Sequence, residues 1–131
     1  MGSEFTFQDF VDDRGKNVIH DWLDDQIPVG AKAKFDKWIL HLEATPHGDW
    51  KRPLVDTLDG HCAGLFEIRV EWDNQQYRLL GAHNAERKPV LLHGFIKPDD
   101  RVDQGECDRA LARKAQVESG AKVRRVRHNY E

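Results

Sequence analysis

Apolar residues recur at helical spacing in the first third of the chain, which predicts two short helices. The first apolar stripe consists of Val18, Ile19, Trp22 and Leu23. Pro28 and Gly30 then interrupt the pattern, because neither residue favours a helix interior. The second stripe consists of Phe35, Trp38, Ile39 and Leu42, and it leaves Lys32, Lys34, Asp36 and Lys37 to solvent. Two helices joined by a Pro/Gly turn predict a helical hairpin.

A change of hydrophobic period after Gly60 predicts β-strands. Residues 66–72 alternate apolar and charged side chains, which is typical of a strand with one face against a core and one face in contact with water. The charged positions of this strand are Glu67, Arg69 and Glu71. A strand of this kind places its charged side chains together on one face of a sheet.

Two further strands follow directly. Residues 77–83 predict the second strand, and the nearly continuous apolar run of residues 89–97 predicts a third strand that is central in its sheet. The turns between consecutive strands are short, and short turns join neighbouring antiparallel strands. The three strands therefore predict an antiparallel meander.

The order of elements predicts the fold class. Residues 5–11 can open a sheet, and a last helix is predicted from Gly105 onward. We therefore expect a small α+β domain over residues 1–131, in which an N-terminal helical hairpin packs on a twisted antiparallel sheet, a C-terminal helix follows, and all helices lie on one face. Residues 1–5 (MGSEF) match what two adjoining restriction sites encode and are left out of the fold. Residues 119–131 are basic and are predicted to be a flexible tail.

Charge and composition say more about where in the cell the protein is expected than about what it does. A net charge of -3 and a pI of about 6.2 are not typical of a nucleic-acid-binding protein. Residues 105–131, however, carry 7 Lys/Arg against 4 Asp/Glu, which can attract phosphate locally. We expect no signal peptide, no membrane span and no membrane partner. Cys62 and Cys107 lack CxxC spacing and are expected to be reduced, which favours the cytoplasm.

Three cations are predicted to share one face of the meander. Arg69 points away from the apolar row of its strand, Arg78 lies on the neighbouring strand, and Lys97 ends the third strand. Converging cations suit a phosphodiester, whose transition state spreads negative charge over the phosphoryl oxygens. A purely structural alternative stays open, in which Arg69 pairs with a carboxylate of the same sheet, such as Glu67 or Glu71.

The histidines and cysteines do not indicate a metal site. The chain has 7 His, but no HExxH motif and no paired CxxC motif. His93 is predicted to be a hydrogen-bonded residue beside the core, and His61 lies in the Gly-rich loop DGHCAG. Cys62 has no ordered base partner in the pattern, so a Cys–His hydrolase is not favoured. We expect neither a metal nor a cofactor.

Three segments together resemble the RelE/ParE toxin superfamily, and in particular its HigB-like, phage-derived branch. They are LDGHCAGLFEIR (residues 58–69), YRL (77–79) and LLHGFIK (91–97). The resemblance spans about residues 16–118, in the order of elements that the hydrophobic pattern predicts. It implies the RelE-like fold.

The resemblance also implies a function: the toxin of a type II toxin–antitoxin system. Such a toxin is a metal-independent endoribonuclease, an RNA-binding hydrolase that cuts mRNA on the ribosome in the cytoplasm. A cognate antitoxin, a small helix-turn-helix protein, neutralises it in a hetero-oligomer. By position, Arg69, Arg78 and Lys97 match the basic residues of the family's strands. Asp56 lies near the carboxylate base of some relatives, and His61 lies in the loop beside it.

The chain also departs from the family pattern. Many relatives continue with a second Lys after the last strand, whereas Pro98, Asp99 and Asp100 follow Lys97 here. Asp59 stands where a Lys or Arg is frequent. These departures leave an alternative open, a non-nucleolytic protein of the same fold. It would be either a ParE-like toxin that targets gyrase or a phage-derived relative that has lost catalysis.

Overall fold

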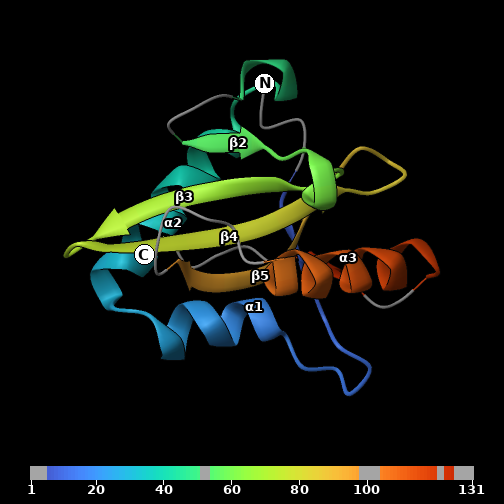
Figure 1. Ribbon diagram of the computed structural model, residues 1–131, viewed down its shortest axis with the longest axis horizontal. Coiled ribbons are helices and arrows are strands. Elements are labelled where there is room, and N and C mark those ends of the chain that lie inside the picture. The colour runs from blue at the N-terminus through green and yellow to red at the C-terminus, as the bar shows by residue number, and fades with distance from the viewer. Residues whose placement is uncertain (1–5, 51–53, 98–103, 121–122, 126–131) are drawn as a thin grey trace.

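The computed structural model describes residues 6–50, 54–97, 104–120 and 123–125 (Figure 1). Its strands are β1 Gln8–Phe10, β2 Val55–Thr57, β3 Phe66–Trp72, β4 Gln75–His83, β5 Pro89–Lys97 and β6 Val123–Arg125. Its α-helices are α1 Val18–Asp21, α2 Val29–Glu43 and α3 Gln104–Glu118. A π-helical segment, η1 Trp22–Gln26, continues α1, and two 3-10 turns are η2 His47–Asp49 and η3 Gly60–Cys62.

The predicted helices and meander are confirmed. The first apolar stripe forms α1 and η1, the second forms α2, and β3, β4 and β5 pair antiparallel in chain order. Asp73 and Asn74 both have positive φ angles of 50° and 63°, which fits the tight two-residue turn between β3 and β4. The helical hairpin packs on the sheet, since α2 contacts β3 and α1 contacts β5.

The sheet has six strands in the order β2-β3-β4-β5-β1-β6 and is mixed, not purely antiparallel. β5 is central as predicted, but its second neighbour, β1, runs parallel to it. The parallel pair arises because β1 and β5 are separated by the helices and the meander, so no tight turn fixes their relative direction. At the outer edge, β6 pairs antiparallel with β1. Residues 123–125 therefore form a strand, although they belong to the segment predicted to be a flexible tail. Residues 1–5 lie outside the described residues.

Helices cover both faces of the sheet, so the prediction that all helices lie on one face is wrong for α3 (Figure 1). On the first face, α1, η1 and α2 bury a core that includes Phe35, Ile68 and Leu79. On the second face, α3 buries Cys107 and Ala110 against a separate core that the strands form with Leu80, Ala82, Val90, Leu92 and Phe95. Because the strands are apolar on both faces at this end, the second face also needs a cover.

One charged residue of α2 lies in an unexpected place. Asp36, predicted to face solvent, is buried, and its Oδ2 accepts a hydrogen bond of 3.0 Å from the Lys32 ammonium. The spacing of four residues lets the lysine stem reach back along the helix and supply the charge partner that a buried carboxylate needs. The prediction of a solvent-exposed Asp36 is therefore wrong.

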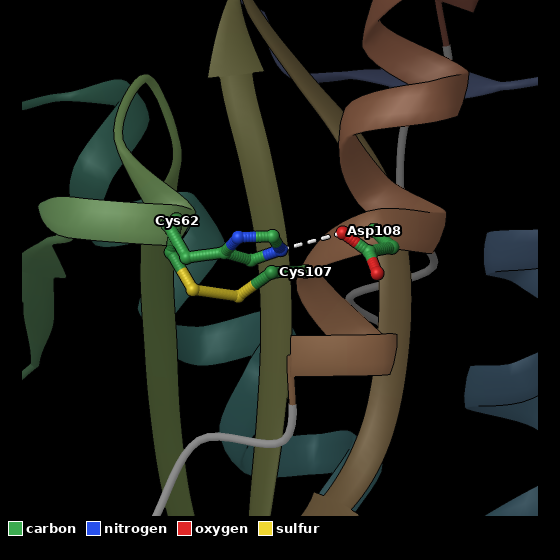
Figure 2. The surroundings of a disulfide bond; sticks show 4 residues. Cys62, Cys107 and Asp108 are labelled. Carbon is green, nitrogen blue, oxygen red and sulfur yellow. Dashed lines mark hydrogen bonds and ion pairs between the residues drawn. A yellow bond between two sulfur atoms is a disulfide. The ribbon is translucent and has the colours of Figure 1, made fainter.

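Cys62 and Cys107 form a disulfide bond between η3 and α3, so the prediction of reduced cysteines is wrong (Figure 2). Both side chains are buried, and their Cα atoms lie 5.5 Å apart, within the usual range for a disulfide. The two cysteines are separated by 45 residues, and such a spacing carries no information about spatial proximity. The cysteines consequently lend no support to a cytoplasmic location.

Candidate functional site

The second face of the sheet carries a cluster of charged residues beyond the part that α3 covers. We call this cluster the charged face; its members are Asp56 from β2, Glu67 and Arg69 from β3, Arg78 from β4 and Lys97 from β5. Strand register places all of them on the same face, because Asp56 is paired with Glu67, Arg69 with Arg78, and Lys97 with Gln76. The charges of the other four residues all act on Glu67. The structure thus brings four of the five predicted site residues to one face of the sheet.

Glu67 is the buried centre of the charged face. Its side chain is 3% exposed, and its Oε1 lies 3.5 Å from Nε of Arg78 and 3.9 Å from Nε of Arg69. Burial raises the pKa of Glu67, and the positive charges of Arg78, Lys97 and Arg69 oppose that rise. Its second oxygen, Oε2, is buried without a hydrogen-bond partner in the described structure. A carboxylate in this setting is held by charge more than by hydrogen bonds.

Arg78 is fixed in place by its surroundings. Its side chain is 3% exposed, one terminal nitrogen donates to the carbonyl of Tyr77 at 3.0 Å, and the other donates to the side-chain oxygen of Gln76. Burial lowers the pKa of Arg78, which Glu67 partly offsets. These contacts account for Arg78 without any contact to a substrate. The alternative that the sequence left open for Arg69, pairing with Glu67, is also present, at 3.9 Å.

Arg69 and Lys97 differ from Arg78 in their exposure. The Arg69 side chain is 31% exposed, and Lys97 is half-buried at the end of β5. Asp56 is also half-buried, on the short strand β2. The charged face therefore presents two cations and a carboxylate towards solvent, above the buried Glu67–Arg78 pair. Such a set can bind a phosphodiester and withdraw a proton from a neighbouring hydroxyl.

A cavity of about 370 Å³ adjoins the charged face along β3; we call it the edge cavity. Its lining includes Lys34 and Trp38 from α2, Leu54, and Arg69, Glu71 and Gln76 from the sheet. On the side of β3 away from β4, the last described backbone contact is the hydrogen bond of 3.0 Å from the Arg69 N–H to the carbonyl of Leu54. Further along the same edge, the Lys34 ammonium donates to the carbonyl of Glu71 at 2.9 Å. The sequence assigned Trp38 to the core by its helical spacing, and no signal in the pattern placed it in a cavity.

His61, the fifth predicted site residue, contacts α3. Its Nε2 lies 2.6 Å from Oδ1 of Asp108, directly beside the disulfide (Figure 2). The His61–Asp108 contact and the disulfide lie next to each other along the chain, because Cys62 follows His61 and Cys107 precedes Asp108. They join the loop before β3 to the first half of α3.

His93 lies on β5 and contacts the same helix. Its Nε2 lies 2.8 Å from Oε1 of Glu106, which confirms the prediction of a hydrogen-bonded histidine beside the core. Burial lowers the pKa of His93, and the contact with Glu106 opposes that change. Three successive residues, 106–108, therefore hold α3 to the rest of the domain.

The described part of the chain holds no group of three or more His, Cys, Asp or Glu residues that could bind a metal ion. Among the same residues, no helix has the length and apolar character of a membrane span.

Residues 21–115 match the family model described as Phage derived protein Gp49-like (DUF891). No curated protein and no solved structure matches the chain significantly. The matched range begins in α1 and ends in α3, and it contains every residue of the charged face.

Proposed function

Because the chain belongs to the phage-derived Gp49-like family of the RelE/ParE-like toxin superfamily, we propose that it is an mRNA-cleaving toxin of the HigB-like branch, with a RelE-like fold. Members of this family are commonly the toxins of toxin–antitoxin pairs. The proposed partners are ribosome-bound mRNA and a cognate helix-turn-helix antitoxin, in the cytoplasm. The observation that carries the proposal is the placement of Asp56, Arg69 and Lys97 on one solvent-accessible sheet face beside a cavity.

The proposed reaction is an attack of the RNA on its own backbone. Asp56 takes the proton of a ribose 2′-hydroxyl, and the oxygen forms a bond to the adjacent phosphorus. Arg69 and Lys97 stabilise the negative charge that develops on the phosphoryl oxygens. The bond from phosphorus to the 5′-oxygen then breaks, and that oxygen takes up a proton. The products are a 2′,3′-cyclic phosphate and a 5′-hydroxyl, and no metal takes part.

Two of the proposed site residues have indirect roles in this scheme. Arg78 keeps Glu67 in place, and Glu67 in turn holds the Arg69 guanidinium at 3.9 Å. Arg78 and Glu67 are therefore positioning residues.

His61 lies in the loop after β2, where its contact with Asp108 fixes the ring. It is the candidate donor of the proton to the leaving oxygen.

Growth and mRNA integrity after brief expression test the proposal, with Lys97→Ala as the informative variant. We expect growth arrest and discrete cuts in cellular mRNA, and Lys97→Ala should slow cutting about 100- to 1000-fold, as is typical for the loss of a charge-stabilising group. Lys88→Ala is the matched control, because Lys88 precedes the opposite end of the same strand. A folded Lys97→Ala protein that cuts as fast as the parent would refute the proposed role of Lys97.

One observation favours a second candidate function. Arg78 is buried in a structural pair with Glu67, so the charged face exists in part to hold the fold together. A non-nucleolytic protein of the same fold needs the charged face only for this structural role. Such a protein would be either a gyrase-targeting toxin of the ParE type or a catalytically degenerate phage-derived relative. Intact mRNA together with DNA-damage signalling after expression would favour the gyrase-targeting function.

A further inference from the structure

The exposed face of α2 carries cations and an aromatic ring at helical spacing. Lys34, Lys37 and Trp38 occupy positions i, i+3 and i+4, so they lie on one side of the helix. The Lys37 ammonium lies 5.4 Å from the centroid of the Trp38 ring. Lys32 differs from these lysines, because it pairs with Asp24 and Asp36. Positive charge interleaved with an aromatic ring is the pattern that single-stranded nucleic acids bind.

Trp38 and Lys34 also line the edge cavity, where they meet Arg69 of the charged face. Trp38 is half-buried and packs against the core, which holds its ring in a fixed orientation. The volume of about 370 Å³ lies near the lower limit of ligand pockets, about 300–1,000 Å³. The cavity is therefore suited to one small unit of a ligand rather than to a whole folded segment.

We propose that the edge cavity binds one nucleotide of single-stranded RNA, with its base stacked on Trp38 and its phosphate between Lys34 and Arg69. This inference rests on the proposed function, because it supplies a binding subsite beside the proposed cleavage site. Lys37 is exposed, so its ammonium can leave the ring for the RNA backbone when a base takes its place. The strand of RNA then runs from α2 across the edge of β3 onto the charged face.

The polar lining favours RNA over an acidic peptide of an antitoxin. Glu71 lines the cavity, and a glutamate side chain can accept hydrogen bonds from the amino groups of bases, which the acidic side chains of a peptide cannot donate. Gln76 can both donate and accept, as base edges require.

Binding of a fluorescent, non-cleavable 2′-O-methyl RNA hexanucleotide to the full chain tests the inference. Base–aromatic stacking is worth about 1–3 kcal/mol, so Trp38→Ala should weaken binding about 5- to 150-fold. Leu40→Ala is the matched control, because Leu40 is an exposed apolar residue of the same helix. Trp38→Phe keeps a stacking surface and should bind within about threefold of the parent.

Intrinsic fluorescence provides a second measurement that does not depend on the folding of Trp38→Ala. RNA should quench the tryptophan emission of the parent, and Trp38→Phe should lose most of that quenching while it keeps its affinity. Parent-like binding by folded Trp38→Ala, or quenching that persists in Trp38→Phe, would overturn the inference. Competition by a polyglutamate peptide as strong as that by unlabelled RNA would also overturn it and would assign the cavity to an acidic partner.

The inference and the proposed function can fail separately. A parent that cuts mRNA, together with Trp38 variants that bind and cut equally well, would remove the subsite but leave the nuclease. Conversely, Trp38-dependent binding by a parent that leaves mRNA intact would establish the subsite and refute the nuclease.

Discussion

Replacing Arg78 by methionine should destabilise the domain strongly, because it leaves the buried Glu67 carboxylate without its main charge partner. Both side chains are 3% exposed, and Arg78 supplies the largest of the attractive interactions that lower the pKa of Glu67. Removing one member of a buried ion pair typically reduces the free energy of unfolding by about 3–5 kcal/mol. A domain of this kind has only about 5–15 kcal/mol in total, so the loss is a large share of its stability.

The same variant should show a characteristic dependence on pH. Glu67 has a pKa above 4.5 in the folded protein, and loss of Arg78 raises it further. A carboxyl whose pKa is raised by folding binds protons more tightly in the folded state, so stability falls as pH rises from 4.5 through the folded pKa. The deficit of Arg78→Met relative to the parent should therefore be largest at neutral pH and should shrink towards pH 4.5.

Urea unfolding followed by tryptophan fluorescence, repeated at several pH values, measures both effects. The control is the double variant Glu67→Leu/Arg78→Met, which removes both charges and should recover most of the lost stability at neutral pH. A loss of less than about 1 kcal/mol in Arg78→Met, a value typical of an exposed pair, would refute the reasoning. A deficit that does not change with pH would refute the assignment of its cause to Glu67.

Three further predictions concern the disulfide, a close contact at Gly81 and the titration of His93. Reduction of the Cys62–Cys107 bond should lower the free energy of unfolding by about 4 kcal/mol on the chain-entropy model for a 45-residue separation, and a Cys62→Ser/Cys107→Ser protein should not respond to reductant. Gly81→Ala should lower the melting temperature and reduce the free energy of unfolding by about 1–3 kcal/mol through overpacking, since its Cβ would lie 2.5 Å from the Phe66 ring. Gly48→Ala is the control and should leave the melting temperature unchanged, because its Cβ would have nothing within 4 Å. An NMR titration should give His93 a pKa below 6.5, so its contribution to stability is present above pH 6.5 and is lost as pH falls through the folded pKa. A His93 ring that titrates at or above 6.5 would contradict this.

Local patterns predicted the strands better than they predicted what covers them. The apolar run of β5 is bounded by prolines in the sequence, so its ends and its central position could be predicted. The alternation in β3 and the meander order sufficed to place Arg69 and Arg78 on one face. The apolar residues of α3 do not predict which face of the sheet the helix packs on, because both faces of β4 and β5 are apolar near the turn that joins them.

Features that depend on long-range contact could not be predicted. The disulfide joins segments that are distant in the chain, and each cysteine alone resembles a small buried apolar residue. Trp38 fits the apolar stripe of α2, and its place in the edge cavity depends on how α2 packs beside β3, which the stripe alone does not give. Likewise, the burial of Glu67 depends on β2 and Arg78 together, whereas the alternation alone indicated a charged side chain in contact with water.

The most direct test of the central claim, that the charged face cleaves RNA through the 2′-hydroxyl, uses purified protein and ribosomes carrying a defined mRNA. We expect a cut whose upstream fragment ends in a 2′,3′-cyclic phosphate, without added metal. A single 2′-deoxy substitution at the scissile nucleotide should abolish that cut and leave binding unchanged. Cleavage that persists on the 2′-deoxy substrate, or an mRNA that stays intact under these conditions, would contradict the account.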